Sequence, residues 1–265
     1  MTTDQTQHRW RHPGQTQTRR ATGAGIVIAT TMAAALTSCA PTETATLEIA
    51  VYTARSPEQH SAIRAETRKR LSQEAGFLWW RPLKIAPPGA LPNSPDDGES
   101  DHKPADEMLF ADVLAWESIA AAKAAAEKVA SDPAYGPFVE SIADIRHFTH
   151  YRAWNAAGRL NEILTGARFI EIAAYTVQDA EQHLQAQRLL YEEKFPGRSG
   201  LAGGARLRRL DAERAFGDLL GWQSVEAWQA TGAAMMADPD LKPFFEGIDE
   251  SIVFALFIED AGGTQ

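Results

Sequence analysis

Two segments of this sequence occur twice, and they keep their order. Leu47–Thr53 (LEIAVYT) is matched 123 positions later by Ile170–Thr176 (IEIAAYT). Phe110–Ser118 (FADVLAWES) is matched 106 positions later by Phe216–Ser224 (FGDLLGWQS). We therefore interpret most of the chain as a tandem duplication of one unit of roughly a hundred residues. This constrains the fold strongly, because both copies must form the same elements.

Each copy has the pattern strand, helix, strand, strand, helix, strand. Aliphatic residues at alternate positions predict the first strand of each copy. A Ser or Asp N-cap followed three residues later by Gln predicts helices that begin at Ser56 and Asp179. The remaining elements of the two copies are expected in corresponding places: strands at 77–83 and 201–210, 110–116 and 216–222, 146–154 and 251–259, and helices at 119–130 and 225–236.

The change of offset from 123 to 106 places 17 extra residues in the first copy. They fall in the proline-rich and charged stretch 86–106, which is unsuited to a strand and is expected to be an exposed loop. The predicted organisation is a leader at 1–38, a tether at 39–46, a first repeat at 47–154, a linker at 155–167 and a second repeat at 168–260.

The N-terminal segment has the features of an export signal. Four arginines precede an apolar run from Ala21 to Leu36, and Leu36-Thr37-Ser38-Cys39 follows. A basic start, a short apolar region and small residues before a cleavage point are typical of a signal peptide. The last four residues resemble a bacterial lipobox, which implies lipidation of Cys39. We therefore expect an extracytoplasmic lipoprotein of the cell envelope, held to the membrane by its lipid anchor only.

The charge balance makes nucleic acid an unsuitable partner. The whole chain carries a formal net charge of −9, and without residues 1–38 it has 22 basic against 34 acidic residues, a net −12. Such a surface repels phosphate backbones and anionic lipid headgroups. Cys39 is also the only cysteine, so no internal disulfide can form.

The order of elements resembles the dimeric α/β barrel superfamily. The Asp-x-x-x-Trp-x-Ser segment, the alanine-rich helix, and the Asp-Pro and Pro-Phe pairs resemble its antibiotic biosynthesis monooxygenase-like domain. The resemblance implies an α+β fold in which two ferredoxin-like βαββαβ repeats form a single-chain dimeric α/β barrel, monomeric as an internal pseudodimer. It also implies a cofactor-independent oxygenase. Two departures weaken this activity and haem binding: Asp112 and Asp218 stand where the family has Asn, and 119–143 and 225–247 contain no histidine.

Strand alternation sorts the side chains onto two faces. We expect the aliphatic face, which includes Leu47 and Ile49, to pack under the helices. The opposite face is then expected to line the barrel interior and to bind a ligand. Its polar and aromatic members in the two copies are Glu48, Tyr52, Asp112 and Trp116, and Glu171, Tyr175, Asp218 and Trp222.

The carboxylates of that face have two interpretations. Burial would raise their pKa values and allow acid or base catalysis. Alternatively, they accept hydrogen bonds from Tyr and Trp and hold the two copies together. The symmetric repetition favours the structural interpretation.

Histidines and tryptophans supply further candidates. His60 and His183 occupy the same position in the first helix of each copy. They are interpreted either as proton carriers or haem ligands, or as packed histidines with a structural role. His147 and His150 occur only in the first copy, which makes them asymmetric candidates for a single catalytic site. Trp79 and Trp80 stand where the second copy has Gly203 and Gly204. Trp79 or Trp80 is therefore a candidate floor of a ligand pocket, with Trp80 among the ligand-binding candidates, or the aromatic side chain simply fills volume left by the glycines.

The predicted function is binding of a small, apolar molecule in a barrel cavity, with a monooxygenase or related enzyme as the alternative. Catalytic candidates are His147, Trp116 and Asp112. The sequence contains no metal-ligand cluster and no phosphate or dinucleotide fingerprint, so we predict no cofactor and no metal.

Overall fold

Eight strands make up the sheet of this protein. The computed structural model describes residues 45–87, 108–154 and 157–260. The predicted leader, Cys39 and nearly all of the predicted insert at 86–106 lie outside these residues. The strands are β1 (Thr46–Ala54), β2 (Phe77–Ile85), β3 (Leu109–Trp116), β4 (Ile142–Ala153), β5 (Phe169–Val177), β6 (Leu201–Arg209), β7 (Ala215–Trp222) and β8 (Ile248–Glu259).

Seven α-helices accompany the strands within the described residues. Three of them begin at a Ser or Asp whose side chain accepts from a backbone N–H of the first turn, at Ser118, Asp179 and Ser224. The helices are α1 (Pro57–Leu71), α2 (Ile119–Ser131), α3 (Gly136–Ser141), α4 (Ala157–Gly166), α5 (Ala180–Leu189), α6 (Val225–Met236) and α7 (Lys242–Glu246).

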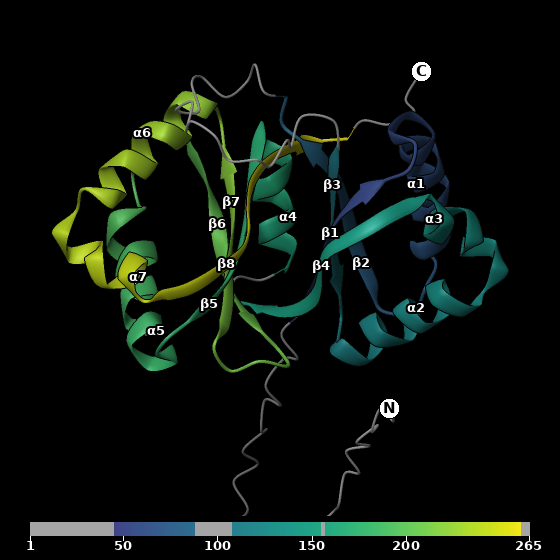
Figure 1. The fold of residues 1–265 in the computed structure, drawn as a ribbon, viewed down its shortest axis with the longest axis horizontal. Helices are drawn as coiled ribbons and strands as arrows, with labels where there is room; N and C mark the ends of the chain where they lie inside the picture. Colours follow the sequence, from purple (N-terminus) through teal and green to yellow (C-terminus); the bar gives the residue numbers. More distant parts are fainter. Residues whose placement is uncertain (1–44, 88–107, 155–156, 261–265) are drawn as a thin grey trace, which may run out of the picture. The chain divides into compact units, whose positions relative to one another are not determined.

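The strands form one closed antiparallel barrel in the order β1-β3-β2-β8-β5-β7-β6-β4, with β4 pairing back to β1. Two short seams, β2 with β8 and β4 with β6, join strands 46–153 to strands 169–259. Helices α1–α3 lie beside the first group of strands and α5–α7 beside the second (Figure 1). This α+β architecture is consistent with a dimeric α/β barrel.

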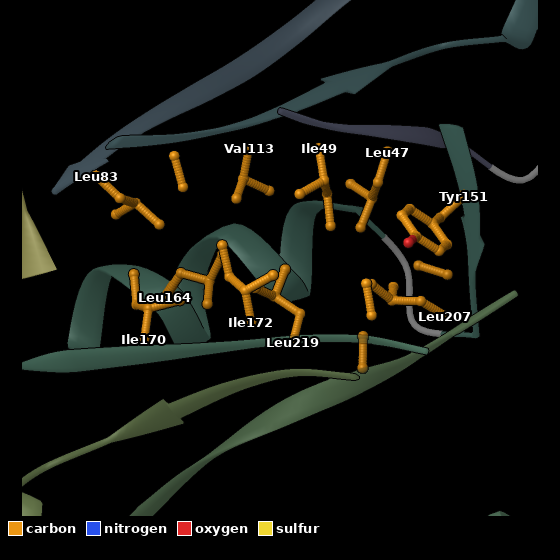
Figure 2. Close-up of a cluster of buried hydrophobic side chains, with 14 of the residues drawn as sticks. Leu47, Ile49, Leu83, Val113, Tyr151, Leu164, Ile170, Ile172, Leu207 and Leu219 are labelled. Carbon is orange, nitrogen blue, oxygen red and sulfur yellow. The ribbon is translucent and has the colours of Figure 1, made fainter. Parts of the chain in front are cut away.

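The barrel interior is filled by aliphatic side chains from both groups of strands. Leu47, Ile49 and Val113 belong to the same buried cluster as Ile172 and Leu219. Figure 2 shows the side chains of the two groups pointing toward one another. Among the described residues this cluster occupies the interior in which the ligand chamber was expected, as side chains do in many eight-stranded barrels.

The expected orientation of the two strand faces was therefore wrong. The aliphatic face points into the barrel, and the face with Glu48, Tyr52, Asp112 and Trp116 lies under the helices. Alternation separates two faces but does not say which one is inside. The polar face needs hydrogen-bonding partners, and the helices supply them, as described below.

The segment predicted as a linker contributes to the core. It carries α4, whose Leu160 and Leu164 are buried in the interior cluster. Figure 2 shows Leu164 among the side chains of this cluster. The two leucines are four residues apart and so share one helical face, which is the sequence signal of this helix.

The described residues include no helix that is long and apolar enough to cross a lipid bilayer.

Candidate functional site

Two cavities lie between the sheet and the helices, one in each half of the described chain. The first has a volume of about 300 Å³ and the second about 490 Å³. All the residues predicted to bind a ligand lie in their walls, but in two separate groups. Glu48, Tyr52, Trp80, Asp112 and Trp116 line the first cavity, and Glu171, Tyr175, Asp218 and Trp222 line the second.

Asp112, in the wall of the first cavity, is part of a buried ion pair. Its Oδ1 lies 2.5 Å from Nη2 of Arg64 and accepts from Nε1 of Trp80 at 2.7 Å. Its Oδ2 accepts from the hydroxyl of Tyr52 at 2.6 Å. Arg64 is 1% exposed and also lies 3.2 Å from Oδ2 of Asp260, at the end of β8. A full positive charge thus compensates the Asp112 carboxylate.

Asp218, the equivalent residue of the second cavity, accepts its hydrogen bonds from neutral side chains among the described residues. Tyr175 and Tyr191 donate to it at 2.7 and 2.8 Å, and Gln187 donates at 3.2 Å. Gln187 stands where Arg64 stands in the first half, 123 positions earlier. Burial raises the pKa of Asp218, and the three hydrogen bonds oppose that rise only in part.

Glu48 and Glu171, the equivalent glutamates of the two cavities, also differ in their partners: Glu48 contacts a histidine, and Glu171 contacts neutral donors. Oε2 of Glu48 lies 3.1 Å from Nε2 of His150 on the neighbouring strand β4. Oε2 of Glu171 instead accepts from two indoles, Trp222 at 3.1 Å and Trp228 at 2.8 Å. Burial, with the negative charge of Asp218, raises the pKa of Glu171 to about 7, against the two indole hydrogen bonds. The second cavity therefore holds a carboxyl group that exchanges its proton near neutral pH.

His60 and His183 support the tyrosines behind the carboxylates. Nε2 of His60 lies 3.0 Å from the Tyr52 hydroxyl, and Nε2 of His183 lies 3.2 Å from that of Tyr175. Both imidazoles are buried, and burial lowers the pKa of each to about 4. Neither ring lines a cavity, so both are packed, neutral histidines at physiological pH.

The two histidines differ at Nδ1, which gives a prediction. Nδ1 of His60 lies 2.7 Å from Oγ of Ser141, whereas Nδ1 of His183 finds no partner in the described part of the chain, because Gly247 occupies the corresponding position. Ser141→Ala should therefore lower the free energy of unfolding by about 1–3 kcal/mol, the usual cost of leaving one buried polar atom unpaired. Urea unfolding of the two proteins measures this, and an unchanged midpoint would show that the contact contributes nothing.

The first-copy histidines of β4 lie on opposite faces. His147 is buried with the inward-facing residues of β4 and bonds the Tyr151 hydroxyl through Nε2 at 2.9 Å. It is absent from the walls of both cavities, so its placement does not suit the predicted catalytic role. The reason is the alternation of β4, which puts His147 on the side of Tyr151 and leaves Phe148 and His150 on the cavity side. Trp80 lines the first cavity, and Trp79 packs against the barrel core.

Three functional residues escaped the sequence analysis: Arg64, Gln187 and Tyr191. Arg64 and Gln187 lie within charged or polar helical segments and resemble solvent-facing residues. The offset of 123 between the matching segments aligns Arg64 with Gln187, a cation with a neutral amide, and this difference is a signal that could have identified both residues. Tyr191 comes from a short π-helix, Leu190–Lys194, that follows α5. Its hydroxyl supplies the hydrogen bond that Trp80 supplies in the first half.

The donor set of the cavities does not fit a haem. No imidazole or thiolate lines either cavity among the described residues, and the two buried histidines use Nε2 on tyrosine hydroxyls. The described residues also contain no group of three or more His, Cys, Asp or Glu placed to hold a metal ion.

No protein-family profile matches the sequence, and no curated protein sequence matches it either. Solved structures do resemble the fold. A proposed monooxygenase from Fusobacterium nucleatum superposes with a TM-score of 0.53 at 10% identity, over 83% of this chain and 96% of the other. An anthrone oxidase-like protein gives 0.52 at 12% (82% and 92%), and a proposed chlorite dismutase gives 0.52 at 10% (82% and 95%). At these identities the similarity establishes the fold alone, that of monooxygenase-like and chlorite dismutase-like proteins.

Proposed function

We propose that this protein is a small-molecule oxygenase that acts on a weakly acidic, mainly apolar substrate in the second cavity. The observation that carries the proposal is Glu171: a carboxyl group in the cavity wall, held only by two indoles, with a pKa of about 7. A general base works best when its pKa lies near the operating pH.

The surroundings of Glu171 suit an aromatic or aliphatic substrate. Most of the wall is apolar, and Phe254, Met236 and Phe245 lie partly exposed along it, at 61%, 76% and 37%. Exposed apolar side chains around a concave site favour entry of an apolar ligand. The similarity in fold to a proposed monooxygenase and to an anthrone oxidase-like protein agrees with this class of chemistry.

The proposed reaction needs no external reductant. Glu171 takes a proton from an activated methylene, and the resulting carbanion is the electron-rich form that reacts with oxygen. A CH₂ group and O₂ then give a C=O group and H₂O, so the substrate supplies all four electrons. Asp218, whose pKa is also raised, is a second group that can hold a proton in the same cavity.

Oxygen uptake with anthrone, a weak carbon acid, tests the proposal. In the full chain carrying Cys39→Ser, Glu171→Gln should lower kcat by about 10²–10⁴-fold, the usual contribution of a general base. Glu48→Gln, at the equivalent position of the first half, should leave kcat within twofold. Equal rates for Glu171→Gln and the parent protein would contradict the proposal.

Binding without chemistry is the second candidate function. The mainly apolar walls of both cavities favour it, since hydrophobic lining alone suffices to hold an apolar ligand. Ligand that co-purifies with the protein, detected by native mass spectrometry, with no oxygen uptake would support it.

The origin and location of the protein are further proposals. We infer that a duplicated ferredoxin-like unit built the barrel, and that this monomeric pseudodimer is exported and lipid-anchored at Cys39 in the cell envelope. The matching registers of the two halves support the duplication, since Glu48 pairs with Leu114 as Glu171 pairs with Leu220. Mass spectrometry of the mature N-terminus tests the anchor, and an unmodified Cys39 would contradict it.

A further inference from the structure

The first cavity differs from the second in the hydrogen-bonding groups of its wall. Both of its carboxylates already face a basic side chain, Arg64 for Asp112 and His150 for Glu48. In the second cavity the corresponding carboxylates accept hydrogen bonds from amide, phenol and indole groups, and the charge of Arg206 acts on Asp218 without a hydrogen bond between the two among the described residues. A ligand that brings an acidic proton is therefore suited to the second cavity and gains nothing of that kind in the first.

The wall of the first cavity includes a residue with an unpaired donor instead. Trp116 forms part of its wall and is 1% exposed, and its Nε1 is buried and has no hydrogen-bond partner among the residues that the structure describes. The equivalent Trp222 donates to Glu171, but Glu48 bonds His150 and leaves the Trp116 indole unpaired. An unpaired buried N–H is costly, and a ligand that accepts a hydrogen bond from it would remove that cost.

Apolar groups make up the rest of the first site. Leu114, Val129 and Phe138 line it, and the partly exposed Phe148 and Ile145 lie at 47% and 57% exposure. We propose that the first cavity is a separate, non-catalytic binding site for a neutral, apolar molecule with a hydrogen-bond acceptor, such as an aromatic ketone. This site is distinct from the proposed oxygenase site and does not depend on turnover there.

Two matched substitutions can close one cavity at a time. Ala126 on α2 and Gly232 on α6 occupy equivalent positions, 106 residues apart, and each lines its own cavity. A side chain built on Gly232 meets no atom within 4 Å at its Cβ, so the position accepts a larger residue. Ala126→Phe and Gly232→Phe are thus designed to fill the first and second cavities.

Calorimetric titration of the full chain carrying Cys39→Ser, with acetonaphthone and with naphthol, tests the proposal. Acetonaphthone is a neutral ketone without an acidic proton, and naphthol is a weak acid with the same rings. Ala126→Phe should weaken acetonaphthone binding at least tenfold, and Trp116→Phe should weaken it roughly fivefold to tenfold, as expected for one lost hydrogen bond. Gly232→Phe and Trp222→Phe should change it less than twofold. For naphthol we expect the opposite result: Gly232→Phe should weaken its binding, and Ala126→Phe should leave it unchanged. Naphthol binding by Ala126→Phe also shows that this variant is folded.

The proposal is overturned if the parent chain does not bind acetonaphthone, if Ala126→Phe and Trp116→Phe bind it as the parent does, or if Gly232→Phe abolishes its binding. Failure of the proposed oxygenase function would appear elsewhere, as oxygen uptake that is indifferent to Glu171→Gln. The two outcomes are therefore separable.

Discussion

Arg64→Met should destabilise the protein by about 3–5 kcal/mol, the usual effect of removing one partner of a buried ion pair. The side chain is 1% exposed and sits between two buried carboxylates, Asp112 at 2.5 Å and Asp260 at 3.2 Å. Methionine keeps much of the volume but leaves both carboxylates without their main cation. Of the cations in the described segments, Lys84 then remains near Asp260, with its Nζ 3.6 Å from Oδ1. Urea unfolding at neutral pH measures the loss.

Two variants show whether charge is the cause. Gln187→Met, at the equivalent position of the second half, removes neutral hydrogen bonds only and should cost about 1 kcal/mol. Adding Asp112→Asn to Arg64→Met removes one of the two uncompensated charges, so the double variant should regain about 1–2 kcal/mol. Equal losses for Arg64→Met and Gln187→Met would mean that packing, and not the ion pair, sets the effect.

Arg64 also connects the halves of the barrel. It lies on α1, and Asp260 follows the end of β8, which pairs with β2 through only three residue pairs. The short seam is reinforced where Asp260 also accepts from Ser61 at 2.7 Å. We therefore expect the loss of unfolding free energy in Arg64→Met to include a weaker contact at the β2–β8 seam as well as the loss of the ion pair in the first cavity.

The sequence predicted the elements because its two matching segments gave each local signal twice. The strand at Leu47 and its copy at Ile170, and the helix starts at Ser56 and Asp179, lie within one or two residues of their observed positions. Local signals of this kind depend on neighbouring residues only, so no knowledge of the tertiary structure was needed.

The placement of the site could not be predicted in the same way. Alternation grouped Glu48 with Tyr52 correctly, but the choice of the inner face depends on which side offers partners for the buried polar groups. Those partners, Arg64 and Gln187, come from helices whose polar residues resemble a solvated face. The pairing of Tyr191 with Asp218 depends on a π-helix that widens the end of α5 and has no equivalent in the first half.

Glu171→Gln should stabilise the protein above pH 7 and have little effect near pH 4. In the unfolded chain this carboxyl group titrates near 4.5, whereas burial raises its pKa to about 7 in the folded protein. Below about pH 4.5 the group is protonated in both states, and its burial carries no ionisation cost. As the pH rises toward 7 the unfolded state loses the proton first, so the stability of the folded state falls. Above pH 7 the cost reaches roughly 3 kcal/mol.

Glutamine resembles the protonated carboxyl group and can still accept from the indoles of Trp222 and Trp228. The difference in unfolding free energy between Glu171→Gln and the parent protein should therefore grow from near zero at pH 4.5 to roughly 2–3 kcal/mol at pH 8. Thermal or urea unfolding across this range measures it, with Glu48→Gln as the matched control, since Glu48 faces His150 and should give no gain at high pH. A gain that is independent of pH would contradict the assignment, because packing differences do not titrate. Such a result would also weaken the proposed oxygenase chemistry, since a carboxylate with an ordinary pKa is a much weaker base than one with a pKa of about 7.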